Sequence, residues 1–211
     1  MALTLVWIAL ALLTVRIIVN LGWRLASRRW SLPCPTALAW ILEKRGLQGI
    51  LGTAKTLDRI DARPGQRVLE IGPGPGRLLL PIAARVLPGG DVIGIDMQQG
   101  MLDKLVSHAR EQGVTNLTTI HGDATVPHVP AASCDIVMLC EVLGEIPDRA
   151  AALAQCFRAL KPGGLLSVTE LLGDPHYQFR SKLKRMAAEA GFRLKSIEGG
   201  WWIYTASFIK P

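Results

Sequence analysis

From Gly65 onward, short apolar runs with the character of strands alternate with stretches of helical periodicity, and this alternation restricts the fold more than any other feature of the chain. The strand-like runs lie at 67–71, 91–95, 117–121, 134–140 and 164–170, and the helical stretches lie at 76–86, 98–111, 148–160 and 178–190. Such alternation predicts a mainly parallel sheet with helices on both faces. Two further strand-like runs, 192–198 and 202–210, predict an antiparallel pair at the sheet edge.

The stretch VLEIGPGPGR, residues 68–77, is an apolar strand followed by a loop of glycine and proline. The loop runs Gly72, Pro73, Gly74, Pro75, Gly76. Its third glycine comes one residue earlier than in the G-x-G-x-x-G loop of dinucleotide-binding proteins. The prolines have no N–H to donate, so the loop is a poor cradle for a diphosphate. The glycines still allow close backbone approach by a ligand beyond the carboxyl end of the strand, where sheets of this kind bind ligands.

Acidic residues follow the next two strands. VIGID, residues 92–96, ends in Asp96, which is placed to accept hydrogen bonds from ribose hydroxyls. HGDAT, residues 121–125, follows the third strand and contains Asp123. Each of these features is common by itself, but their order and spacing together are far more specific.

With these segments in this order, residues 50–211 resemble the class I S-adenosylmethionine-dependent methyltransferases, and most of all the menaquinone and ubiquinone branch. VLEIGPGPGR is similar to the first motif of the family, VIGIDMQ to its second-strand motif, CDIVMLCEVLGEIPD to its fourth-strand segment, and LKPGG to the segment before its fifth strand. The resemblance implies an α/β, Rossmann-like, seven-stranded sheet of order 3-2-1-4-5-7-6 with the last strand antiparallel.

The resemblance also implies S-adenosyl-L-methionine as the cofactor and a role for individual residues. The residues implied to contact the cofactor are Glu70, Gly72, Gly74 and Gly76 at the methionine part, Asp96 at the ribose, Asp123 and Ala124 at the adenine, and in addition Met97 and Glu141. The predicted catalytic residues are Glu141, His176 and Tyr177, with Glu145 and Glu170 as further carboxylates near the same strand ends. Glu141 as an ordinary strand-end carboxylate and His176 as an exposed loop histidine are the alternatives.

The amino-terminal region is apolar and basic. Residues 1–63 hold nine Lys and Arg against three Asp and Glu, a net +6 of the formal +7. The run 2–15 has no charge, and apolar character resumes after Arg16 as far as Trp23. Spanning a bilayer takes roughly 20 apolar residues, so this run is long enough only if Arg16 is tolerated.

Basic residues follow the apolar run instead of preceding it, which disfavours a cleaved signal peptide. The positive-inside rule then places the rest of the chain on the cytoplasmic side. We predict a membrane anchor helix over 1–24, basic connecting helices over 25–63, one of them at 36–49, and the methyltransferase domain over 64–211. A helix lying in the membrane interface is the alternative to a spanning one.

An anchored enzyme gains most if its acceptor is dissolved in the bilayer. We therefore predict methylation of a lipophilic small molecule, namely a quinone or polyprenyl-phenol, a phospholipid amine or a hydrophobic thiol. A protein or nucleic-acid methyltransferase and a non-catalytic binding module are the alternatives. LCEVLG stands where base methyltransferases carry an N-P-P-Y-like tetrad, so no nucleic-acid partner is expected. The attacked atom and the oligomeric state stay open.

Two smaller expectations concern cysteine and tryptophan. The cysteines show no C-x-x-C spacing, so no metal site and no disulfide framework are predicted. The aromatic residues of the final strand region are expected to pack in the sheet core, with an aromatic wall for a lipid-like acceptor as the alternative: Trp201, Trp202, Tyr204 and Phe208.

Overall fold

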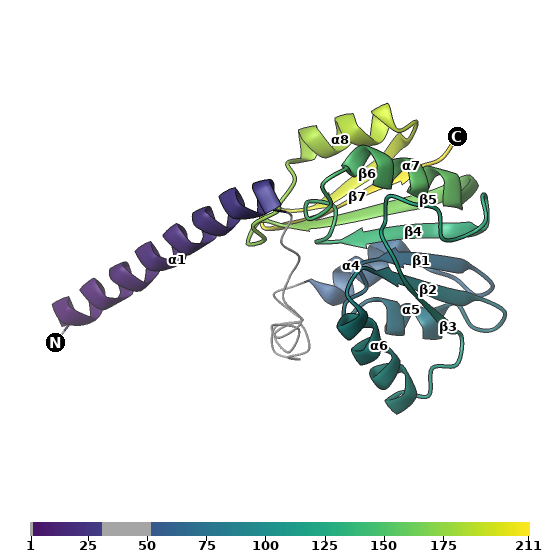
Figure 1. Cartoon of the computed structure of the whole chain (residues 1–211), viewed down its shortest axis with the longest axis horizontal. Helices are drawn as coiled ribbons and strands as arrows, with labels where there is room; N and C mark the ends of the chain where they lie inside the picture. The colour runs from purple at the N-terminus through teal and green to yellow at the C-terminus, as the bar shows by residue number, and fades with distance from the viewer. Residues whose placement is uncertain (1, 31–51) are drawn as a thin grey trace.

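A seven-stranded sheet organises the protein, and its strand order is β3-β2-β1-β4-β5-β7-β6 (Figure 1). The computed structural model describes residues 2–30 and 52–211. The strands are β1 (Arg67–Ile71), β2 (Asp91–Asp96), β3 (Leu117–His121), β4 (Cys134–Cys140), β5 (Leu160–Leu171), β6 (Arg193–Gly199) and β7 (Ile203–Ile209). β1 pairs in parallel with β2 and β4, whereas β7 is antiparallel to β5 and β6. The predicted fold, strand order and antiparallel last strand are confirmed.

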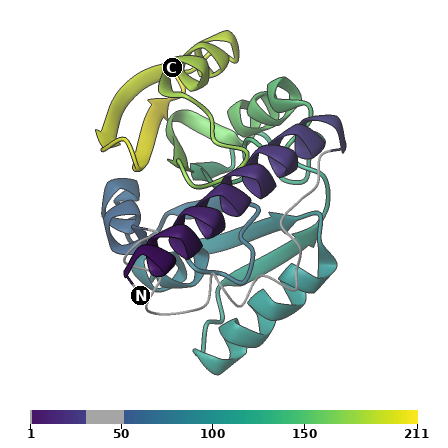
Figure 2. The ribbon, with the colours of Figure 1, turned by 90° about the vertical axis from the view of Figure 1, so that its left-hand side faces the viewer.

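Helices cover both faces of this sheet (Figures 1 and 2). They are α4 (Thr53–Ile60), α5 (Leu79–Arg85), α6 (Gln99–Glu111), α7 (Arg149–Ala159) and α8 (Arg180–Glu189). α4, α5 and α6 share one apolar core with one face of the sheet, and α7 and α8 share another with the opposite face. α4 was not predicted as a separate helix. It falls within the predicted connecting region, and it buries Leu57 and Ile60 in the core of the α/β domain.

Strand β1 shows how the two cores are divided. Val68 packs with the α4–α5–α6 side, while Leu69 and Ile71 pack with the α7–α8 side. Because side chains alternate between faces and both faces are covered, a central parallel strand becomes a nearly continuous apolar run. Each such side chain contributes about 1.5–3 kcal/mol when fully buried. Glu70 interrupts the apolar run at the end of this strand, where ligands bind in sheets of this type.

The amino-terminal region forms one helix, α1 (Ala2–Trp30). Large apolar side chains along it are exposed, among them Trp7, Leu12, Ile18 and Leu25. Among residues 2–30 and 52–211, no helix has the length and apolar character needed to cross a membrane, so the predicted spanning anchor is not supported. The predicted helix over 36–49 lies outside the described residues.

Candidate active site

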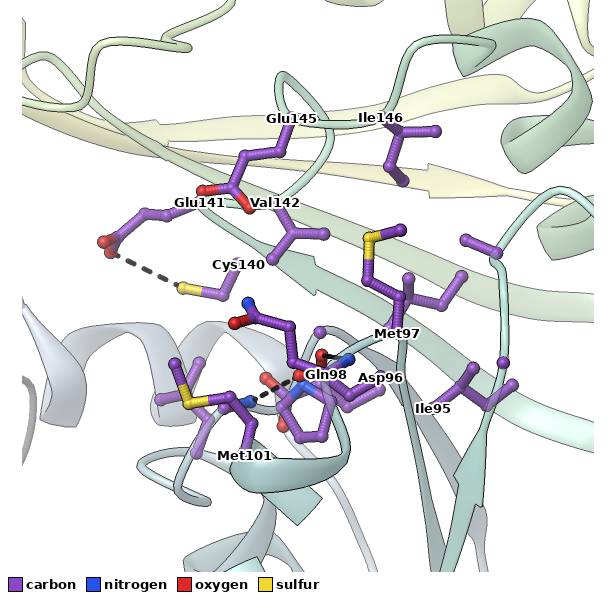
Figure 3. A pocket seen from close by; sticks show the side chains of 18 of the residues that line it. Ile95, Asp96, Met97, Gln98, Met101, Cys140, Glu141, Val142, Glu145 and Ile146 are labelled. Atoms are coloured by element: carbon purple, nitrogen blue, oxygen red, sulfur yellow. Dashed lines mark hydrogen bonds between the residues drawn. The ribbon is translucent and has the colours of Figure 1, made fainter. Parts of the chain in front are cut away.

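A cavity of about 260 Å³ opens at the carboxyl ends of β1, β2 and β4 (Figure 3). Its walls come from the glycine loop after β1, the end of β2 with the start of α6, the loop after β3, and the loop after β4, with Asp174 from the loop after β5. Asp96, Gln98 and Met101 lie on one side, and Glu141, Val142, Glu145 and Ile146 lie on the other (Figure 3). Parallel topology thus brings together strand ends that are far apart in the sequence.

The glycine loop forms one wall by lying tightly against its neighbours. Gly72 donates its N–H to the carbonyl oxygen of Ile95 at 2.8 Å, and a Cβ on it would lie 2.5 Å from Val142. Gly74 has a φ of +53°, and a Cβ there would have no described atom within 4 Å, so its open side faces the cavity. Gly76 does not line the cavity. A Cβ on Gly76 would clash with Leu80 and Leu105, so this glycine serves the packing of α5 and α6.

Asp96 ties the end of β2 to the glycine loop. Its Oδ1 accepts a hydrogen bond from the N–H of Gln98 at 2.9 Å, and its Oδ2 lies 3.4 Å from the N–H of Gly74. The residue is 9% exposed. Burial raises the pKa of its carboxyl, and the backbone donors partly oppose that shift. Met97 beside it is exposed at the rim of the cavity.

The loop after β3 carries the predicted adenine residues, and both Asp123 and Ala124 line the cavity. Asp123 Oδ1 accepts hydrogen bonds from the N–H of Thr125 at 2.8 Å and from its hydroxyl at 2.9 Å. The Asp123 carboxylate is therefore held by the loop that bears it. Ala124 and Ile95 add apolar surface beside it.

Glu70 is buried at the floor of the cavity and has only 2% of its surface exposed. Burial raises the pKa of its carboxyl to about 8, while nearby Arg77 and a hydrogen bond from the N–H of Leu79 act in the opposite direction. Its Oε2 has no hydrogen-bond partner among the residues that the structure describes. Burial of a carboxyl without full compensation favours its neutral form.

Arg77, the residue after the glycine loop, was not singled out from the sequence. Its guanidinium donates to Glu141 Oε1 at 3.0 Å, to Cys140 Sγ at 3.2 Å and to Thr53 Oγ1 at 3.1 Å. The side chains of Arg77 and Glu141 are only 9% and 12% exposed. Glu141 has a φ of +60°, an uncommon backbone state for a residue with a side chain. The ion pair therefore joins α4, the glycine loop and the end of β4.

The predicted catalytic residues lie in different places. Glu141 lines the cavity, whereas His176 and Tyr177 do not. The ring of Tyr177 packs edge-to-face on Tyr204, with 5.9 Å between centroids, and partial burial raises its pKa. His176 donates its N–H to Asp174 Oδ1, and Asp174 is the residue of this loop that reaches the cavity.

Glu145 and Glu170 were the remaining carboxylate candidates. Glu145 lines the cavity. Glu170 is 1% exposed beneath the loop after β5, where its Oε2 accepts a hydrogen bond from the N–H of Gln178 at 2.9 Å. Burial raises the pKa of Glu170 to about 8. The carboxylates that line the cavity from the loops after β4 and β5 are thus Glu141, Glu145 and Asp174, with Glu170 enclosed beneath the loop after β5.

Comparison with known proteins agrees with this geometry. Residues 68–164 match the family model described as "Methyltransferase domain". A solved S-adenosylmethionine-dependent methyltransferase from Aquifex aeolicus superposes with a TM-score of 0.78 at 17% identity, over 85% of this chain and all of that one. Residues 68–164 thus resemble the class I S-adenosylmethionine-dependent methyltransferases in sequence, and the fold agrees with that resemblance. The likeness implies S-adenosyl-L-methionine as the cofactor.

Two relatives illustrate the sequence similarity of this region to methyltransferases. The chain is 36% identical over 139 residues to nocamycin O-methyltransferase of Saccharothrix syringae, covering 65% of this chain and 50% of that protein. It is 38% identical over 125 residues to ubiquinone biosynthesis O-methyltransferase of Hahella chejuensis, covering 56% of this chain and 50% of that protein. The chain spans about half the length of these curated relatives.

The residues of the cavity suit S-adenosylmethionine. The carboxylate of Asp96 lines the cavity and would accept hydrogen bonds from a ribose diol, and the open side of Gly74 leaves room beside it. Glu70, which the resemblance assigns to the methionine part, would offer its buried Oε2, an atom without a hydrogen-bond partner among the described residues. Ile95, Met97 and Ala124 supply apolar surface for the adenine. When bound, the cofactor supplies a methyl group already activated by a sulfonium, so the chain has to provide orientation and, for some acceptors, a proton acceptor.

Proposed function

We propose that this protein transfers a methyl group from S-adenosylmethionine to a lipophilic small-molecule acceptor. The observation that supports the proposal is the cavity itself. Asp96 and Gly74, which we assign to the cofactor, line it together with Glu141, Glu145 and Asp174 from the loops after β4 and β5, the side that we assign to the acceptor. The relatives support the class of acceptor by their names, which refer to nocamycin, aklanonic acid and ubiquinone or menaquinone biosynthesis.

The chain's own residues would act mainly by alignment. Val142, Ile146 and Met101 give the space between the two ends apolar walls, which limit the access of water. Glu141 is held at a fixed position by Arg77, so it serves as a rigid, negatively charged wall near the site of transfer. Glu145 and Asp174 reach the cavity from the acceptor side and are the groups placed to accept a proton from an acceptor hydroxyl or amine.

We further propose that α1 holds the enzyme at a lipid surface, with the methyltransferase domain on the cytoplasmic side. The support is the exposure of its large apolar side chains, of which Trp7 is 66% and Leu25 is 68% exposed. Exposed large apolar side chains along a helix favour contact with the apolar part of a bilayer, and the strength of such binding grows with the apolar area that is buried. Confinement to the bilayer would raise the effective concentration of a lipid-dissolved acceptor. Co-sedimentation of the full chain with phospholipid vesicles tests this part separately.

Calorimetric titration of S-adenosylmethionine into the detergent-solubilised full chain tests the cofactor site. Asp96→Asn removes the charge of a buried acceptor, and we expect it to weaken binding by about 10- to 100-fold, the worth of one or two hydrogen bonds to a charged group. Asp103→Asn, the same change at an exposed position of α6, is the matched control and leaves binding unchanged. If the folded wild-type protein bound neither the cofactor nor its demethylated product, the proposal would be wrong.

A further inference from the structure

The turn between β6 and β7 exposes a pair of tryptophans, contrary to the expectation that they pack in the sheet core. Trp201 is 74% exposed and Trp202 is 36% exposed, and their rings meet edge-to-face with 5.8 Å between centroids. Phe179, just before α8, is 64% exposed. Tyr204 and Phe208 are buried, as expected. Trp201, Trp202 and Phe179 together form what we call the aromatic rim. Large exposed aromatic groups of this kind mark interaction surfaces.

The aromatic rim adjoins the mouth of the cavity. Trp202 accepts a hydrogen bond at its carbonyl oxygen from the N–H of Leu172 at 2.8 Å, and a Cβ on Gly173 would lie 3.5 Å from the Trp202 ring. The next residue, Asp174, lines the cavity. On the other side, the ring of Phe179 contacts Tyr177 at 5.4 Å between centroids. A surface that covered the rim would therefore lie beside the acceptor side of the cavity.

Two positive charges flank the turn. Arg180 donates to the carbonyl oxygens of Gly199 and Gly200, and Arg59 donates to the hydroxyl of Thr205 at 3.3 Å. Neither guanidinium forms an ion pair with a carboxylate in the described part of the chain. Glu198, the acidic residue nearest to the turn in sequence, accepts a hydrogen bond from Ser196 and forms no ion pair with either arginine. The Arg180 guanidinium also lies over the Tyr204 ring, 5.0 Å from its centroid. Because neither arginine is neutralised by a carboxylate, both bring positive charge to the turn, which favours an anionic partner.

We infer that the aromatic rim docks the methyltransferase domain on an anionic bilayer surface, with the mouth of the cavity turned toward the lipid. Tryptophan rings favour the membrane–water interface, because one edge is apolar and the indole N–H stays hydrated. Arginines beside them favour anionic headgroups. The exposed apolar side chains of α1 in the same chain favour lipid over a protein partner. The inference deepens the proposed function by giving a lipid-dissolved acceptor a direct route to the cavity.

Amide hydrogen exchange of the full chain tests the docking without using methyl transfer. Exchange is followed with and without vesicles of phosphatidylcholine and phosphatidylglycerol, and again with phosphatidylcholine alone. We expect the anionic vesicles to slow exchange in 198–203 and 176–181 by about tenfold, with a smaller effect from neutral vesicles. The segment 111–116, which precedes β3 at the opposite edge of the sheet, serves as the internal reference.

Two variants make the test specific. Trp201→Ser removes an exposed ring that packs on Trp202, and we expect it to abolish most of the protection of the turn. Leu87→Ser is the matched control, because Leu87 is 48% exposed in the loop before β2, away from the mouth of the cavity. It should leave the protection as in the wild-type protein.

Each other outcome overturns the inference. If the α1 segment were protected and the turn were not, α1 alone would hold the membrane and the rim would be a site for a different partner. If neither segment were protected, the chain would not bind lipid at all. Calorimetric binding of S-adenosylmethionine to the same preparation reports the cofactor site in every case, so a failure of docking is separable from a failure of the proposed function.

Discussion

Replacement of Glu170 by glutamine should make the stability of the protein less dependent on pH. The carboxyl of Glu170 is 1% exposed, and burial raises its pKa from 4.5 to about 8. Between these two values the unfolded chain has lost the proton while the native protein keeps it. The native state then binds more protons than the unfolded state, so the free energy of unfolding falls as the pH rises.

The linkage relation gives the size of this effect. For a pKa of 4.5 in the unfolded chain and about 8 in the native protein, Glu170 removes about 3 kcal/mol of stability between about pH 5 and pH 8. Glutamine has nearly the same shape, and its side-chain carbonyl can still accept the N–H of Gln178. Glu170→Gln should therefore be more stable than the wild-type protein at the upper end of this range, with little difference at the lower end.

Urea unfolding at a series of pH values measures the effect directly. Glu111→Gln, at an exposed position at the end of α6, is the control and should follow the wild-type curve. The pKa of Glu70 is also raised to about 8, so part of the pH dependence of stability should remain in both variants. Parallel curves for the wild-type protein and Glu170→Gln would refute the reasoning, since they would mean that Glu170 ionises alike in the native and unfolded states.

Two further predictions concern the site. Arg77→Gln leaves the buried carboxylate of Glu141 without its cation and should lower the free energy of unfolding by about 3–5 kcal/mol. The double variant Arg77→Gln/Glu141→Gln should recover most of this loss. A double-mutant cycle that showed no coupling between the two residues would contradict the role of the ion pair as an organising contact. Gly74→Ala should lower stability by only about 1–2 kcal/mol, because alanine is strained at the left-handed φ of this position. It should weaken S-adenosylmethionine binding about tenfold or more, because the added methyl group projects into the cavity. Equal affinity of the variant and the wild-type protein by calorimetry would mean that the ligand does not approach Gly74.

Much of the fold was predictable because the central strands are buried on both faces. Mostly apolar runs at 67–71 and 134–140 have few structural alternatives to buried strands when helical periodicity separates them. α4 escaped prediction because Thr53–Ile60 is short and lies in a basic region, so its buried residues do not stand out by composition. The exposure of Trp201 could not be predicted either, because an aromatic residue after Gly199 and Gly200 suits a turn or a core equally well.

The cofactor end of the site was predictable for a topological reason. In a parallel sheet of known order, Gly74, Asp96 and Asp123 must meet at one edge, because each follows the carboxyl end of a neighbouring strand. The contacts of Arg77 depend on side-chain packing between α4 and the end of β4, which no local pattern encodes. The raised pKa values of Glu70 and Glu170 likewise follow from depth of burial, a property of the assembled fold.

The acceptor end was harder to predict because a single loop after β5 serves three purposes. The carbonyl oxygen of His176 lies so close to Gly144 that no side chain fits between them, and this contact fixes the loop against the loop after β4. Tyr177 then turns toward the core, where it packs on Tyr204, and Asp174 reaches the cavity in its place. The same loop carries Gly173 against Trp202. A contact made at the aromatic rim would therefore act on the segment that positions Asp174, so docking and acceptor binding share one structural element.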